Sequence, residues 1–302
     1  MQHRRILVTG GGGFLGQWLA RRLLARGLRV RLMDLPRAQG ASGQEGVEWH
    51  AGDVRRADDV CAALAGCDGV AHLAGLLTPA CLADPVRGAE VNLLGSLHLF
   101  EAARQQGLDR VVYASTAGVY GPHAGQPLPI THYGAFKLAT EGAARASWHA
   151  HGLASVGLRP YVVYGPERLH GASAGPSLAC RAAVQGEPCT IGYSGAAGLV
   201  YVDDVAHVFE HALLDAPAHG AQVFNLAGAV HTVDEVIAEI HRQVPGARLA
   251  ACGPPLGIAP DIGEDGLDAW FPDRPRTSLA QGIAATLAHY RHAPGTHPKD
   301  NP

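Results

Sequence analysis

A run of glycines between a short apolar segment and an amphipathic one constrains the fold of this chain more than any other feature. Residues 5–27 read RILVTGGGGFLGQWLARRLLARG. The first five residues predict a strand, and residues 14–27 have the apolar periodicity of a helix. Gly10 and Gly13 lie between the strand and the helix, and Gly16 lies in the helix. Glycine at such positions permits unusual torsions, a close approach to a pyrophosphate and close packing of helix on strand. The free N–H groups of the helix start favour phosphate.

A glycine pattern alone also fits a tight surface turn. Here a second strand, RVRLMD at residues 29–34, follows the helix, so strand, turn, helix and strand occur in the order of a dinucleotide-binding unit. Further strands are predicted at 47–53, 69–75, 110–116 and 154–160, with helices at 57–66, 88–107 and 132–152 between them. This alternation predicts an α/β fold of Rossmann type, a doubly wound parallel sheet.

The alternation loosens after residue 160. Residues 164–177 are rich in glycine and proline and predict an irregular loop. Helices are predicted at 178–186, 233–244 and 278–291, a strand–helix unit at 199–215, and a strand at 222–226. We therefore expect a dinucleotide-binding core at 1–160, a smaller C-terminal lobe at 161–290 that mainly binds substrate, with some segments returning to the core, and a disordered tail at 291–302.

Composition argues against several classes of partner. The formal charge of −3 and the pI of about 6.6 do not suggest nucleic acid or an anionic membrane. The apolar stretch near the N-terminus is too short for a signal-peptide core, and no run approaches a membrane span. The six cysteines are scattered without a C-x-x-C pair, which predicts free thiols and a cytoplasmic location. No histidine pattern has the spacing of a metal site, so no metal is expected.

Two aspartates end predicted strands at the edge where the dinucleotide is expected. Asp34 can accept hydrogen bonds from both adenosine ribose hydroxyls and would repel a 2′-phosphate, which favours NAD over NADP. Its alternative is a solvated loop residue, and Arg37 nearby could blunt the discrimination. Asp53 can reach the adenine edge, or it can cap the helix that follows.

The stretch HYGAFKLATEG contains Tyr133 and Lys137, four residues apart on a predicted helix. This spacing is common by chance and fits two ordinary neighbours on one helix face. Other motifs must decide between that interpretation and a catalytic pair.

Taken together, the motifs resemble the extended short-chain dehydrogenase/reductase family, of the NAD-dependent epimerase/dehydratase type. The resemblance is carried, in family order over roughly residues 4 to 290, by TGGGGFLG, GDV, HLAG, VNLLGSLHLFEAAR, YASTAGVYG, YGAFK, LRPYVVYGP, YVDDVA and FNLAG. It implies that Thr116, Tyr133 and Lys137 are the catalytic residues. The Lys137 ammonium would lower the pKa of Tyr133, so that the phenol can exchange a proton with a substrate alcohol during hydride transfer.

The resemblance also implies a set of cofactor-binding residues that includes the catalytic pair and Asn92, for which a buried structural amide is the alternative. The set is Gly10, Gly13, Phe14, Leu15, Gly16, Asp34, Asp53, Val54, Leu73, Ala74, Gly75, Asn92, Ser115, Tyr133, Lys137, Pro160 and Val163. A homodimer through the helices that follow the fourth and fifth strands is expected from the same resemblance.

Departures from the family pattern bear on the substrate. Val162 stands where many nucleotide-sugar members have asparagine, and Ala197 lies near the place of a diphosphate-binding arginine. These favour a small sugar-like or sugar-acid substrate, bound by Thr116 and by Arg168 and His170, for which solvated loop residues are the alternative. The main hypothesis is an NAD-dependent dehydrogenase or reductase of such a secondary alcohol. A nucleotide-sugar epimerase or dehydratase with tightly bound NAD is the alternative, and an inactive dinucleotide sensor is a third.

Overall fold

The computed structural model describes residues 4–36, 45–264 and 266–292. Its core is a seven-stranded sheet in the order β10-β6-β5-β4-β1-β2-β3, in which every neighbouring pair is parallel. The strands are β1 (Arg5–Thr9), β2 (Arg29–Asp34), β3 (Val47–Ala51), β4 (Gly69–His72), β5 (Arg110–Ala114), β6 (Ala154–Pro160) and β10 (Ala221–Leu226). The order reverses between β1 and β4, the place where open α/β sheets bind ligands.

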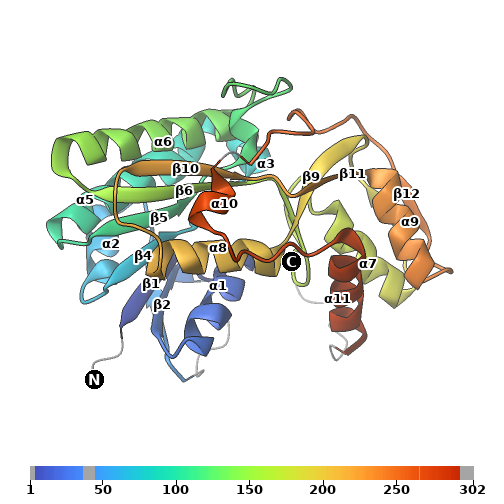
Figure 1. Ribbon diagram of the computed structural model, residues 1–302, viewed down its shortest axis with the longest axis horizontal. Coiled ribbons are helices and arrows are strands. Elements are labelled where there is room, and N and C mark those ends of the chain that lie inside the picture. Colours follow the sequence, from blue (N-terminus) through green and yellow to red (C-terminus); the bar gives the residue numbers. More distant parts are fainter. Residues whose placement is uncertain (1–3, 37–44, 265, 293–302) are drawn as a thin grey trace.

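Helices cover both faces of this sheet (Figure 1). On one face lie α2 (Ala57–Leu64), α5 (Gly95–Gln105) and α6 (His132–His151), and on the other lie α1 (Phe14–Ala25) and α8 (Val202–Leu214). Apolar side chains fill the layer under α2, α5 and α6, where Leu7, Phe100 and Tyr113 are fully or almost fully buried. Burial on both faces explains why the central strands are continuous apolar runs.

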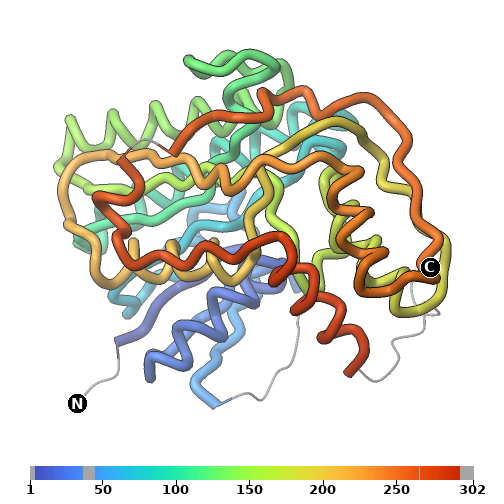
Figure 2. Tube along the Cα trace, turned by 45° about the vertical axis from the view of Figure 1, so that its right-hand side comes forward, coloured from blue at the N-terminus to red at the C-terminus, as the bar shows by residue number. Residues whose placement is uncertain are grey.

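A second lobe lies beside the sheet and is visible at the right of Figure 1. It contains a three-stranded sheet and a two-stranded sheet with helices packed against them. Its elements are β7 (Val162–Tyr164), α7 (Gly175–Gln185), β8 (Cys189–Ile191), β9 (Ala196–Tyr201), β11 (Ala229–Thr232), α9 (Val233–Gln243), β12 (Leu249–Ala251) and α11 (Leu279–His292). Although α8 and β10 follow β7 in the chain, they belong to the core layers. Figure 2 shows the chain after β12 running back from this lobe toward the core.

Several elements differ from the sequence prediction. The helix expected at 88–107 is divided into α4 (Pro85–Ala89), a π-helical turn η2 (Glu90–Leu94) and α5. The helices α3 (Thr78–Ala83) and α10 (Leu267–Trp270) and the short strands β7, β8, β11 and β12 were not predicted, because they are too short to show periodicity. The tail expected from residue 291 begins inside α11, which ends at His292, and residues 293–302 lie outside the described part of the chain.

Candidate functional site

The glycine turn fits a dinucleotide because its glycines have no room for a side chain. Gly10 has a φ of +67°, and a Cβ there would lie 2.8 Å from the backbone nitrogen of Ala74. A Cβ on Gly16 would overlap the carbonyl oxygen of Gly10. Gly13 caps α1 without a side chain, so the first N–H groups of the helix remain open toward the turn. A turn of this geometry can hold a phosphate group at the helix start.

A groove of about 210 Å³ leads from this turn across the carboxyl ends of the strands. Its lining includes seven predicted cofactor residues, which are Gly10, Gly13, Asp34, Asp53, Val54, Leu73 and Ala74. Gly75 also lines the groove, on the β4 side. The sequence-predicted adenosine and pyrophosphate residues are thus brought together in one place.

The two aspartates of the groove, Asp34 and Asp53, form polar contacts with neighbouring residues. One oxygen of Asp34 accepts from the backbone N–H of Gly12 at 2.9 Å, which ties the end of β2 to the glycine turn. Asp53 forms an ion pair with Arg55 at 2.6 Å, and this pairing lowers the pKa of Asp53. Asp53 also accepts from the Arg55 backbone N–H ahead of α2, whose N-cap is Arg56. Arg37 lies outside the described residues.

Asn92 occupies the π-helical turn and is fully buried. Its Nδ2 donates to the carbonyl oxygens of Leu76 and Gly88 at 3.1 and 3.0 Å, whereas its Oδ1 has no partner among the described residues. A Cβ on Gly75 would lie 2.7 Å from that Oδ1 and 3.5 Å from Lys137 Nζ. An unpartnered buried acceptor is costly, and π turns are frequent at functional sites. The amide therefore fits a role at the inner end of the groove.

Tyr133 and Lys137 stand one turn apart near the start of α6. The helix begins after Thr131, whose Oγ1 caps it by accepting from the Gly134 N–H at 3.1 Å. Lys137 Nζ lies 5.9 Å from the centroid of the Tyr133 ring. Thr116 follows β5 and borders the same cavity as Tyr133. The three candidate catalytic residues are therefore gathered where the groove meets the second lobe.

The electrostatics of this pair differ from the sequence prediction. Burial raises the pKa of Tyr133 to about 12, and a hydrogen bond with Thr116 and the charge of Arg168 offset only part of the rise. Burial also lowers the pKa of Lys137 to about 8, against the opposing effects of Cys81 and Glu141. Loss of hydration penalises both charged forms. The expected fall in the pKa of Tyr133 is therefore not seen in the protein alone.

A buried ionic network behind the pair was missed by sequence reasoning. Glu141 and Arg159 form a bidentate ion pair, with contacts of 2.7 and 2.5 Å, and the Ser115 hydroxyl donates to Glu141 at 2.5 Å. Tyr133, Lys137 and Glu141 are spaced four residues apart and therefore share one helix face. This spacing was a sequence signal for the position of Glu141 in the network. The network ties α6 to the ends of β5 and β6.

A cavity of about 410 Å³ opens beside Tyr133 and Thr116. Its walls also include the predicted residues Ser115, Pro160, Val163 and Arg168, and Val162, which departs from the family pattern. The 254–258 segment and Tyr193 complete it, and neither carried a sequence signal. His170 is exposed and Ala197 is buried, and both lie outside the lining. The structure therefore brings Arg168 to the cavity but not His170.

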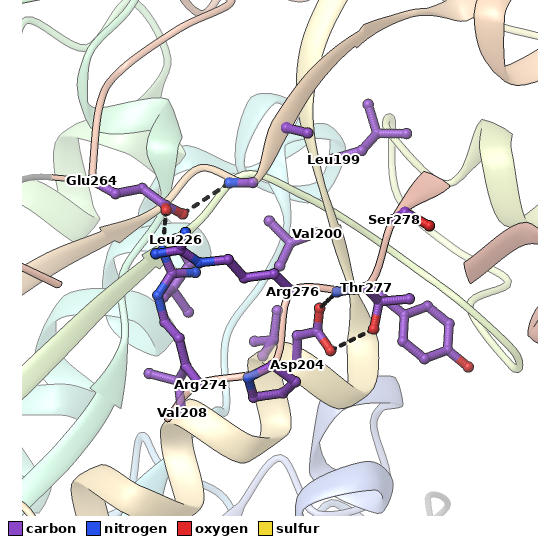
Figure 3. A pocket seen from close by; sticks show the side chains of 15 residues that line it. Leu199, Val200, Asp204, Val208, Leu226, Glu264, Arg274, Arg276, Thr277 and Ser278 are labelled. Atoms are coloured by element: carbon purple, nitrogen blue, oxygen red, sulfur yellow. Dashed lines mark hydrogen bonds and ion pairs between the residues drawn. The ribbon is translucent and has the colours of Figure 1, made fainter. Parts of the chain in front are cut away.

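A second cavity, of about 310 Å³, lies between β9, β10, α8 and the 274–278 segment (Figure 3). Each charged side chain of its lining has a hydrogen-bond partner. Asp204 accepts from Thr277 through both oxygens at 2.7 Å, and Glu264 accepts from Arg274 at 2.5 Å. None of the predicted site residues lines it. These polar contacts attach the C-terminal segment to the core.

The remaining predicted cofactor residues lie close to the turn without lining the groove. Phe14 and Leu15 form the first turn of α1, and Phe14 lies under the Arg168 guanidinium at 6.0 Å. Within the described ranges, no group of three or more histidine, cysteine, aspartate or glutamate side chains could hold a metal ion. No described helix is long and apolar enough to cross a membrane.

Comparison with known proteins agrees with this geometry. A model described as the NAD dependent epimerase/dehydratase family matches residues 6–227, which span the glycine turn, Tyr133 and Lys137. The chain belongs to this family. It is therefore an enzyme of the NAD-dependent oxidoreductase and epimerase class, within the extended short-chain dehydrogenase/reductases.

Individual relatives include epimerases and a dehydrogenase. The UDP-glucose 4-epimerase of Mycolicibacterium smegmatis is 31% identical over 95% of this chain and 99% of its own. The structure of the Thermus thermophilus UDP-glucose 4-epimerase in complex with NAD superposes with a TM-score of 0.82 at 31% identity, covering 96% of this chain and 99% of that one. Human 3 beta-hydroxysteroid dehydrogenase type 7 is 39% identical over 39% of this chain and 34% of its own.

Proposed function

We propose that this family member is an NAD-dependent epimerase that inverts a hydroxyl-bearing carbon of a nucleotide-linked sugar. The observation that carries the proposal is the placement of Thr116, Tyr133 and Lys137 between the dinucleotide groove and a cavity in the second lobe. The near full-length similarity to UDP-glucose 4-epimerases supports the same reaction. Epimerisation of a nucleotide sugar thereby takes precedence over net oxidation of a small alcohol.

The groove residues would hold the cofactor. The glycine turn would bind the pyrophosphate, Asp34 the adenosine ribose, and Lys137 with Asn92 Oδ1 the nicotinamide end. Bound NAD supplies the chemistry of accepting a hydride from a sugar carbon and returning it. NAD is preferred over NADP because the Asp34 carboxylate would repel a 2′-phosphate. The variant Asp34→Ala should bind NADP more tightly than the wild type, and an unchanged NADP affinity would contradict this assignment.

The proton chemistry belongs to Tyr133. Its Oη would take the proton from the sugar hydroxyl while Thr116 Oγ1 holds the substrate oxygen. It would return the proton after the sugar ring has rotated to present its opposite face to the cofactor. The high pKa of Tyr133 keeps the phenol protonated at neutral pH in the protein alone. The Lys137 ammonium and the positive charge of the oxidised cofactor favour its ionised form when a substrate is bound.

The test is an isomer assay on the purified enzyme. UDP-glucose and UDP-galactose are incubated separately with the protein, the product isomers are measured by NMR, and the absorbance of NADH is recorded. Epimerisation predicts that each substrate yields a mixture of both isomers without net NADH. Nucleotide released by denaturing the protein should contain NAD. Absence of isomers from these and other nucleotide sugars would refute the proposal.

One observation favours a second candidate, a dehydrogenase of a smaller sugar or sugar acid. Among the described residues, Arg168 is the only charged side chain that lines the cavity, and Val162 there is apolar. Diphosphate sites normally use several charge-assisted contacts. This candidate predicts net NADH from a free sugar acid or polyol plus NAD, with no isomer of the substrate.

We also propose a cytoplasmic homodimer. The exposed apolar side chains Val86, Leu94 and Leu97 lie along the segment from α4 to α5, which packs beside α6. Joining these faces in two copies would remove the patch from water. Light scattering should report a dimer, and Leu97→Glu should shift it toward monomer; a monomeric wild type would contradict the proposal.

A further inference from the structure

The substrate cavity has an unusual balance of charge. It is bordered by hydroxyls from Ser115, Thr116 and Thr131, by tyrosines and by apolar side chains. Arg168 is its only charged residue among those that the structure describes, and no described carboxylate lies within 4.0 Å of its guanidinium. A half-buried cation without a counterion attracts an anionic group of a ligand.

The Arg168 guanidinium is fixed in place by the loop after β7. Nη1 donates to the carbonyl oxygen of Val163, and Nη2 donates to Ser173 Oγ at 2.8 Å. The side chain crosses the face of Phe14, with its Cζ 6.0 Å from the ring centroid. These contacts use two of the five N–H donors of arginine. Three donors remain available on a guanidinium that these contacts hold in place.

Arg168 also lies near the reacting groups. Arg168, Tyr133 and Thr116 line the same cavity. Burial raises the pKa of Tyr133, and the charge of Arg168 opposes part of that rise. An anion bound by Arg168 would therefore sit close to the alcohol that faces Tyr133.

We propose that Arg168 binds a carboxylate on the sugar itself, so that the preferred substrates are uronic acids or other sugar acids in which the carboxylate lies a few bonds from the reacting hydroxyl. This inference rests on the proposed function only in assigning the cavity to substrate. It deepens that function by naming the substrate class.

The chemistry of the cavity favours a carboxylate over a diphosphate as the partner of Arg168. A carboxylate has one negative charge and two oxygens whose spacing matches the guanidinium fork. A diphosphate brings more charge than one arginine can balance, and no second cation lines the cavity among the described residues.

The experiment measures binding, so that it does not depend on turnover. Calorimetry on the NADH-loaded enzyme compares UDP-glucuronate with UDP-glucose, and free D-glucuronate with D-glucose, because each pair differs only in the carboxylate. UDP alone reports on the diphosphate. The proteins are the wild type, Arg168→Gln, Arg168→Lys and a matched control, Arg29→Gln, which replaces an exposed arginine on β2 away from the cavity.

The wild type and the Arg29→Gln control should bind the acid of each measurable pair about 10- to 100-fold more tightly than the neutral sugar. Arg168→Gln should lose that preference, and Arg168→Lys should keep part of it, while the affinities for UDP and NADH stay unchanged. A wild type without acid preference, or a preference that survives in Arg168→Gln, overturns the inference. An equal loss of UDP affinity in Arg168→Gln would assign Arg168 to the diphosphate, and a loss of NADH affinity would assign it to the cofactor; either result overturns the inference. Acid preference without any epimerisation would refute the proposed function alone.

Discussion

The buried ammonium of Lys137 should lower the free energy of unfolding of the protein, although the enzyme needs this group for activity. Lys137 is almost completely buried and forms no ion pair within the described residues. Its ordinary pKa of 10.5 falls to about 8 because burial removes its hydration, with Cys81 and Glu141 opposing the fall. Each pKa unit corresponds to about 1.4 kcal/mol, so the charged form costs the folded state about 3 kcal/mol at neutral pH.

The sign of the pH dependence follows from the two pKa values. Below pH 8 both the folded and the unfolded chain hold the proton, so the full cost is present. Between pH 8 and 10.5 the unfolded chain binds the proton more strongly than the folded one, so the cost shrinks as the pH rises and vanishes above 10.5. Replacing Lys137 with methionine keeps the apolar stem and removes the charge.

Urea denaturation should therefore show Lys137→Met to be more stable than the wild type by up to about 3 kcal/mol at pH 7, and by less than half of that at pH 9.5. The variant should have lost turnover. The chain has two lysines, Lys137 and Lys299, so NMR of protein labelled with ¹⁵N at lysine can follow the titration directly. The groups that face Lys137 are His72 on β4, Cys81 on α3, and Tyr133 and Glu141 on α6. Equal stability at both pH values, or a Lys137 pKa near 10.5, would contradict the cost assigned to the buried ammonium.

Three further changes test the surroundings of the pair. Thr116→Val should lower kcat about 100-fold, since the substrate oxygen loses its hydrogen bond, and Thr116→Ser should restore most of it; equal rates in the two variants would exclude a role for the hydroxyl. Gly16→Ala should abolish NAD binding and lower the free energy of unfolding by more than about 1 kcal/mol, because its Cβ would meet the Gly10 carbonyl; calorimetry with NAD checks this, and unimpaired binding would contradict a phosphate site at this turn. Glu141→Gln should destabilise the protein by about 3 kcal/mol in urea, because it leaves the largely buried Arg159 without its counterion; a loss below about 1 kcal/mol would show that the pair is not structural.

The glycine turn and the parallel core could be predicted because their causes are local. At Gly10 and Gly16 the neighbouring backbone leaves no room for a Cβ, and strand–helix alternation is visible as a change of period. The π-helical turn could not be predicted in this way. It depends on how Asn92 packs against Leu76 and Gly88, which the helical pattern of 88–107 does not record.

The substrate side of the site was less accessible to sequence reasoning. Arg168 and His170 are two residues apart and looked equivalent, but contacts with Val163 and Ser173 turn Arg168 into the cavity and leave His170 exposed. The 254–258 wall comes from a segment without regular structure. The raised pKa of Tyr133 depends on how deeply the phenol is enclosed, and spacing alone does not reveal that.

The most direct test of the account is the removal of one oxygen atom, Tyr133→Phe. Isomer formation from the nucleotide sugar that the wild type converts, and the NAD dissociation constant by calorimetry, are measured side by side. Turnover should fall by at least about 100-fold, since proton transfer by a positioned side chain contributes that much or more, while NAD affinity should stay within about twofold. Turnover equal to the wild type would contradict the assignment of proton transfer to Tyr133.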